Sequence, residues 1–143
     1  MRAAHTAFFG GSSEARGQTM AEFAMVASVF LLLLFGIMQV TLTVYNYDTV
    51  CSAAREAVRY AIVRSPTSPN PATTAQIQQI AINTAVGLNP SQLTIAVSWP
   101  ADTNLPAQSD ARVKVSYQYQ LQIPFFAPVT MTLASTSQML VSQ

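Results

Sequence analysis

Charged side chains are scarce in this chain: Asp, Glu, Lys and Arg together make up 9% of its 143 residues. Soluble domains of average composition carry about 25%. The formal net charge is +1, so the sequence has no basic field that would recruit nucleic acid and no acidic tail. We therefore expect no nucleic-acid partner.

Residues that carry catalysis or bind metals are equally scarce. The chain has one histidine, His5, and one cysteine, Cys51, so an intrachain disulfide and a cysteine-rich metal site are impossible. Its carboxylates are scattered, and there is no glycine-rich phosphate loop, Gly-x-Ser-x-Gly motif or zinc-ligand spacing. We expect no enzymatic activity, no catalytic residue, no metal and no cofactor. Cys51 is interpreted as a small apolar helix residue, with an intermolecular disulfide or lipidation as alternatives.

A long apolar run is what the sequence has instead. No charge occurs between Glu22 and Asp48, and Phe23–Val44 consists mainly of Phe, Val, Leu, Ile, Met and Ala. As a helix, its 22 residues would measure about 33 Å, which matches a hydrocarbon core of about 30 Å. A buried core helix or a cleavable secretory signal are the alternatives, but the run is long and passes directly into a further helical pattern. We predict a retained transmembrane helix over residues 18–47.

A short polar segment ending in Gly17 precedes this helix, and Glu22 and Phe23 follow at its start. A carboxylate beside a membrane span is costly unless it is solvated or finds a cation. Cleavage after Gly17 would place a new amine on Gln18, four residues from Glu22 and on a similar helix face. The amine could pair with Glu22 of the same chain or of a neighbour. A simple solvated boundary residue is the alternative.

The helix is expected to continue over residues 48–64, because apolar residues recur there at three- and four-residue intervals. These residues are Val50, Ala54, Ala57, Val58 and Ala61. The proline-rich stretch 65–71 should end the helix. Thr73 and Gln76 then offer a capping box for a second helix that carries Ile77, Ile80, Ala81 and Leu88 and ends near Gly87.

The last third of the chain predicts β-strands. Apolar residues alternate with polar ones over 93–98 and again over 113–123, and a third strand begins at Val129 after two proline breaks. The turn-rich stretch Trp99–Asp110 should join the first two strands. Tyr117 and Tyr119 are interpreted as core residues, with ligand stacking as the alternative. Residues 65–143 are thus expected to form a small α+β domain with a three-stranded antiparallel meander.

Three stretches of this sequence resemble a known family. Gly17-Gln-Thr-Met-Ala-Glu22-Phe23 is similar to the prepilin processing site of the Flp/Tad branch of type IV pilins. Together with the Leu-rich span and Ala53-Ala-Arg-Glu-Ala-Val-Arg-Tyr-Ala61, it resembles TadE-like pseudopilins, or minor pilins. Pro124-Phe-Phe and the later strands also resemble that family. The span lacks the early proline of many relatives, which implies a less kinked helix.

The resemblance implies a pilin-like α+β fold and a prepilin-type leader, residues 1–17, cleaved after Gly17 by a separate prepilin peptidase. It also implies a role in a tight-adherence (Flp-type) pilus or its secretion apparatus. The expected partners are other pilin-like subunits, the inner-membrane assembly platform and the lipid bilayer. The protein would be single-pass in the bacterial inner membrane, with its C-terminal domain extracytoplasmic. The alternatives are an uncleaved anchor that presents a small binding domain and a pseudopilin whose filament stays within the envelope.

Overall fold

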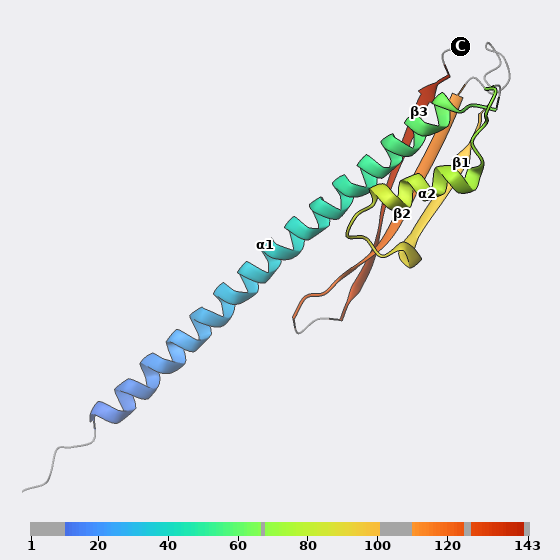
Figure 1. The fold of residues 1–143 in the computed structure, drawn as a ribbon. Helices are drawn as coiled ribbons and strands as arrows, with labels where there is room; N and C mark the ends of the chain where they lie inside the picture. Colours follow the sequence, from blue (N-terminus) through green and yellow to red (C-terminus); the bar gives the residue numbers. More distant parts are fainter. Residues whose placement is uncertain (1–10, 67, 101–109, 125–126, 142–143) are drawn as a thin grey trace, which may run out of the picture. The chain divides into compact units, whose positions relative to one another are not determined.

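The fold is a long helix followed by a short helix and a small sheet (Figure 1). The computed structural model describes residues 11–66, 68–100, 110–124 and 127–141, with only the backbone of 11–16. Helix α1 covers Gly11–Val63 and helix α2 covers Thr74–Thr84; a 3₁₀ turn, η1, at Pro90–Gln92 leads into strands β1 (Leu93–Ser98), β2 (Asp110–Leu121) and β3 (Val129–Leu140). This confirms the predicted α+β, pilin-like fold. By its packing the chain divides into two units, Met1–Met38 and Gln39–Gln143.

Prolines end α1 where the sequence predicted. At the end of α1, Arg64 N–H donates a backbone hydrogen bond to the Tyr60 carbonyl at 3.3 Å. The Arg64 carbonyl accepts a hydrogen bond from Ala72 N–H at 2.9 Å. The intervening prolines have no amide to donate, so the helical ladder cannot continue through them. Ala72 is therefore hydrogen-bonded to the end of α1, eight residues after Arg64. This contact places the start of α2 beside the C-terminal part of α1.

One face of α1 in the second unit, called the alanine face below, consists of four alanines and two valines. Its fully buried residues are Val50, Ala53, Ala54, Ala57, Val58 and Ala61. The charged residues Arg55, Glu56 and Arg59 are exposed on the other side. The predicted apolar stripe is therefore confirmed, and it joins α2 and the sheet in a single hydrophobic core.

Helix α2 begins with the predicted capping box. Thr73 Oγ1 accepts from Gln76 N–H at 3.3 Å, and Gln76 Oε1 accepts from Thr73 N–H at 3.0 Å. The helix was predicted to end near Gly87 and it ends at Thr84, because Ala85 leaves the helical conformation and the chain turns through Gly87 at φ 85°. Leu88 therefore lies outside the helix, although it still contributes to the core.

The sheet is an antiparallel meander in the order β1-β2-β3. On β2, Val113, Val115 and Tyr117 are buried while Arg112 and Lys114 on the opposite face are exposed. Because only one face of the strand is covered, both helices pack on the same side of the sheet. The β1 edge is partly closed by α2, since Gln78 Nε2 donates to the Ile95 carbonyl at 3.1 Å.

Strand β2 is shifted from its predicted bounds of 113–123. It starts earlier because Asp110 and Ala111 pair with Leu140 and Met139, and it ends at Leu121, opposite Val129. Pro124 cannot donate to a ladder, so the pairing stops shortly before it. Most of the predicted turn-rich stretch, residues 101–109, lies outside the described residues, as do Phe125 and Phe126.

Candidate processing and assembly segment

The predicted processing residues lie inside a helix. Because α1 already begins at Gly11, Gly17, Gln18, Glu22 and Phe23 all have helical backbone. All four are exposed, and a Cβ added at Gly17 would meet nothing within 4 Å. Within this unit the Gly17–Gln18 peptide bond is thus sterically open to another protein. Residues 1–10 of the predicted leader, with His5, lie outside the described residues.

Gln18 and Glu22 lie one helical turn apart and face each other. Gln18 Nε2 donates to Glu22 Oε1 at 3.5 Å, at the long limit of a hydrogen bond. This contact places the two residues on the same helix face, as their four-residue spacing predicts. A positive amine on Gln18 would therefore be formed within reach of the Glu22 carboxylate.

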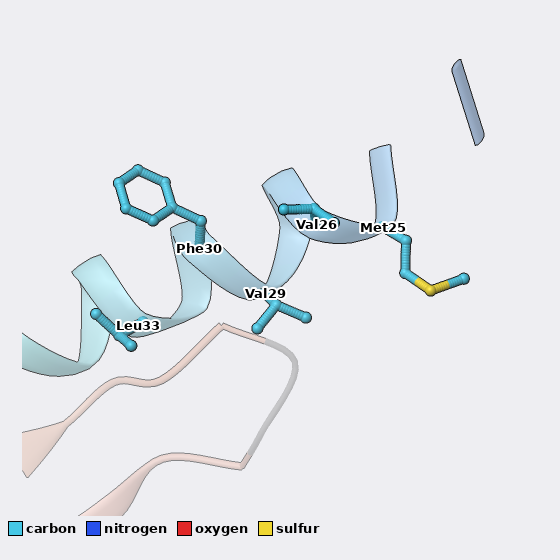
Figure 2. Close-up of a pocket in the computed structure, with 5 residues that line it drawn as sticks. All are labelled: Met25, Val26, Val29, Phe30 and Leu33. Atoms are coloured by element: carbon cyan, nitrogen blue, oxygen red, sulfur yellow. The ribbon is translucent and has the colours of Figure 1, made fainter. Parts of the chain in front are cut away.

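The helix that follows is apolar and uncovered. Its most apolar 18-residue window has a mean hydropathy of 2.4, and none of that window is buried. Met25, Val26, Val29, Phe30 and Leu33 line a shallow hollow without a polar lining atom (Figure 2). Exposing such a surface to water is unfavourable, whereas lipid chains solvate it. Among the described residues, this one helix is long and apolar enough to span a membrane, consistent with membrane anchoring.

Polar side chains within the apolar run are hydrogen-bonded. Ser28 Oγ donates to the Ala24 carbonyl at 2.7 Å, and Thr43 Oγ1 donates to the Gln39 carbonyl at 2.8 Å. A hydroxyl group that donates to the carbonyl of the preceding turn has its hydrogen-bond donor satisfied within the helix. The run can therefore enter a bilayer without leaving these two hydroxyl donors unsatisfied.

Gln39 makes a contact that sequence reasoning missed. Its Oε1 accepts a hydrogen bond from Tyr119 Oη at 3.1 Å, across 80 positions of the chain. The two residues are half-buried and belong to the second unit. Tyr117 is buried in the core as predicted, but Tyr119 is an outer core residue whose hydroxyl holds the end of β2 to α1. The signal available in the sequence was the lone amide side chain within the apolar run.

The described residues contain no clustered chemistry. No group of three His, Cys, Asp or Glu side chains is placed to hold a metal within the part of the chain that the structure describes. Cys51 is half-buried on α1, beside the alanine face. The first unit offers exposed residues at positions 17 and 18 within a helix, an exposed carboxylate at Glu22 and an apolar surface compatible with lipid.

The comparisons agree with the resemblance found in the sequence. The sequence model of the family described as TadE-like protein matches residues 17–59, which confirms the similarity to TadE-like proteins. The match starts at Gly17 and ends at Arg59, so it includes five of the six buried residues of the alanine face of α1. No curated protein and no solved structure was found to match the chain.

Proposed function

Because residues 17–59 match the TadE-like family, we propose that this protein is a non-enzymatic, membrane-held minor pilin or pseudopilin. In this role it is processed after Gly17 and takes part in assembling a tight-adherence (Flp-type) pilus or its secretion apparatus. The observation that carries the proposal is the position of the family match, which begins at Gly17 and includes the exposed apolar helix.

The proposed processing step is hydrolysis of the Gly17–Gln18 peptide bond by a separate prepilin peptidase. Water adds across the bond, leaving a carboxylate on Gly17 and an amine on Gln18. The local chain supports this step, because Gly17 lies near the end of α1 and glycine weakens a helix by about 1 kcal/mol relative to alanine. Unwinding the first turns to present an extended peptide to a protease is correspondingly easier.

Processing changes the electrostatics at Glu22. The new helix starts at Gln18, so the Glu22 carboxylate comes to lie near a helix N-terminus and close to a positive amine. Both the helix N-terminus and the amine attract the negatively charged carboxylate. The contact between the Gln18 side chain and Glu22 supports this pairing, because it places the carboxylate on the helix face of Gln18. In an assembly, the same carboxylate can accept the amine of a neighbouring subunit and set their axial register.

The proposed location follows from the same family. The helix is held in the bacterial inner membrane, with the N-terminus cytoplasmic and the α+β domain extracytoplasmic. The partners are the peptidase, other pilin-like subunits and the inner-membrane assembly platform.

Mass spectrometry of the membrane-extracted protein tests the processing step. In cells that contain the peptidase we expect an N-terminus at Gln18, and in cells without it an intact Met1. Gly17→Leu should block cleavage. Gly36→Leu is the matched control, because Gly36 lies on the same helix and is also open around its Cα. An intact Met1 in the presence of the peptidase would show instead an uncleaved membrane anchor.

Assembly is tested separately through Glu22. We expect Glu22→Ala to leave membrane insertion unchanged and to reduce co-purification with other pilin-like subunits. Glu56→Ala removes another exposed carboxylate from the same helix and should not reduce it. Equal recovery of partner subunits with Glu22→Ala and with the unaltered chain would contradict the assigned role of Glu22.

A further inference from the structure

One end of the second unit is free of charge. No charged residue occurs between Gln39 and Tyr47 on α1, and none follows Lys114 in the sequence. The charged residues of the sheet lie at its opposite end, where Gln138 bridges Asp110 and Arg112. The sheet is therefore polarised along its strands.

The uncharged parts of helix and sheet lie together. Tyr119 Oη donates to Gln39 Oε1 at 3.1 Å, and β2 continues past this point to Leu121, which pairs with Val129 of β3. We call this region the apolar end, comprising residues 39–47, 119–124 and 127–131. Its exposed large side chains are Val40, Leu42, Val44, Tyr45, Tyr47, Val129 and Met131.

The length of the apolar helix fixes the depth of this region in a bilayer. Phe23–Met38 alone would measure about 24 Å, which is shorter than a hydrocarbon core of about 30 Å. The helix needs residues up to about Val44 to cross it. Gln39 lies five residues before Val44, about 7.5 Å along the axis. Whatever binds Gln39 must therefore lie at or below the boundary of the hydrocarbon core.

We propose that the apolar end is a membrane-contact surface, with its described residues of β2 and β3, including Leu121 and Val129, in the interfacial layer of the bilayer. This inference rests on the membrane-held role proposed above. The membrane-length apolar run Phe23–Val44 itself includes the first residues of this surface, Gln39 to Val44, and Val40 and Val44 are exposed. Interfacial segments bury their apolar faces about 5–10 Å into the headgroup and acyl boundary, which matches the depth of Gln39.

The chemistry of the surface fits this occupant. Tyrosine is enriched at membrane–water interfaces because its ring is apolar and its hydroxyl is polar, and Tyr45, Tyr47 and Tyr119 all belong to the apolar end. Val129 is 54% exposed although it faces the helix side of the sheet. An exposed valine at the start of a strand costs nothing when lipid, rather than water, surrounds it.

Depth-dependent fluorescence tests the proposal on the full chain in phosphatidylcholine–phosphatidylglycerol vesicles. In a Cys51→Ser background, an environment-sensitive dye is attached to Val129→Cys, and a nitroxide on the upper acyl chain of the lipid serves as quencher. Thr136→Cys is the matched control, because Thr136 is an exposed residue of the same strand, opposite Lys114. Val29→Cys reports on the span itself.

We expect the nitroxide to quench most of the fluorescence at positions 129 and 29, and none at 136. Quenching at 29 without quenching at 129 would overturn the membrane contact of β2 and β3 and leave the membrane span intact. A blue-shifted but unquenched dye at 129 would show that protein, such as a second copy, covers the surface, and would also overturn the proposal. No quenching at 29 would refute the membrane-held role itself.

Discussion

The hydrogen bond between Tyr119 and Gln39 ties the end of β2 to α1, so removing it should loosen the second unit. In Tyr119→Phe the ring stays in place and only the hydroxyl is lost. Gln39 is half-buried, so its freed oxygen is not enclosed in the protein core. The loss should therefore be near the average for one hydrogen bond, about 1 kcal/mol, and below the roughly 3 kcal/mol of a fully buried orphan acceptor.

A double-mutant cycle isolates this contribution. Tyr119→Phe, Gln39→Leu and the double variant are unfolded thermally as full chains in detergent micelles, with near-ultraviolet circular dichroism of the aromatic residues as the signal. A loss of about 1 kcal/mol corresponds to a fall in melting temperature of about 4–8 °C for a domain of this size. The coupling energy between the two sites should be about 0.6–1 kcal/mol. Tyr45→Phe is the control, because Tyr45 is an exposed tyrosine on the same helix.

The effects of Tyr119→Phe and Gln39→Leu on stability should not be additive. If the two single variants add to within about 0.3 kcal/mol of the double variant, the side chains do not interact and the contact contributes nothing to stability. If Tyr45→Phe lowers the melting temperature as much as Tyr119→Phe, the effect arises from any tyrosine hydroxyl and not from this bond.

Three further predictions concern the core and the turns of the second unit. Ile77→Ala should lower the free energy of unfolding by about 2–5 kcal/mol in chemical denaturation, because Ile77 is 1% exposed and its loss leaves a cavity. A smaller loss than that of Ile80→Ala, at a half-buried site, would contradict the central position of Ile77 in the core. Thr73→Ala should cost about 1 kcal/mol by removing the cap of α2, seen as faster amide exchange in the first turn, and unchanged exchange there would contradict the capping role. Gly87→Ala should cost about 1–3 kcal/mol, since Gly87 has a φ of 85°, whereas Gly36→Ala should be neutral or stabilising; equal melting temperatures for the two variants would refute the strain argument.

Much of the fold could be predicted because local patterns and packing agree. The alternation on β2 and the stripe on α1 each mark one buried face, and the structure places these faces in one core. The capping box was predictable because Thr73 and Gln76 satisfy each other's backbone amides without help from distant residues.

The predictions differ from the structure where contacts between residues far apart in the sequence determine the bounds of an element. The start of β2 at Asp110 depends on pairing with Leu140, which no local pattern reveals. The end of α2 depends on a turn that brings Leu88 into the core, so an apolar residue at helical spacing was assigned to the wrong element. The Gln39–Tyr119 bond joins two residues far apart in the sequence, and neither residue alone points to the other.

The processing segment is a different case. Gly17, Gln18, Glu22 and Phe23 were identified from spacing and resemblance, and the structure adds their exposure and the Gln18–Glu22 contact. Cleavage and assembly involve other proteins, so their test lies in the experiments on Gly17 and Glu22.

The alanine face of α1 has a consequence for how the small core is assembled. Four of its six fully buried residues are alanines, which lose no side-chain rotamer freedom on burial, and the other two are valines, which have little to lose. Ordering the helix side of the interface therefore carries almost no side-chain entropy cost. Alanine and valine side chains also cannot change rotamer to fill or free space on the helix side of the core. Changes in core size must be accommodated by the strands, where Val113, Val115 and Tyr117 supply the bulk.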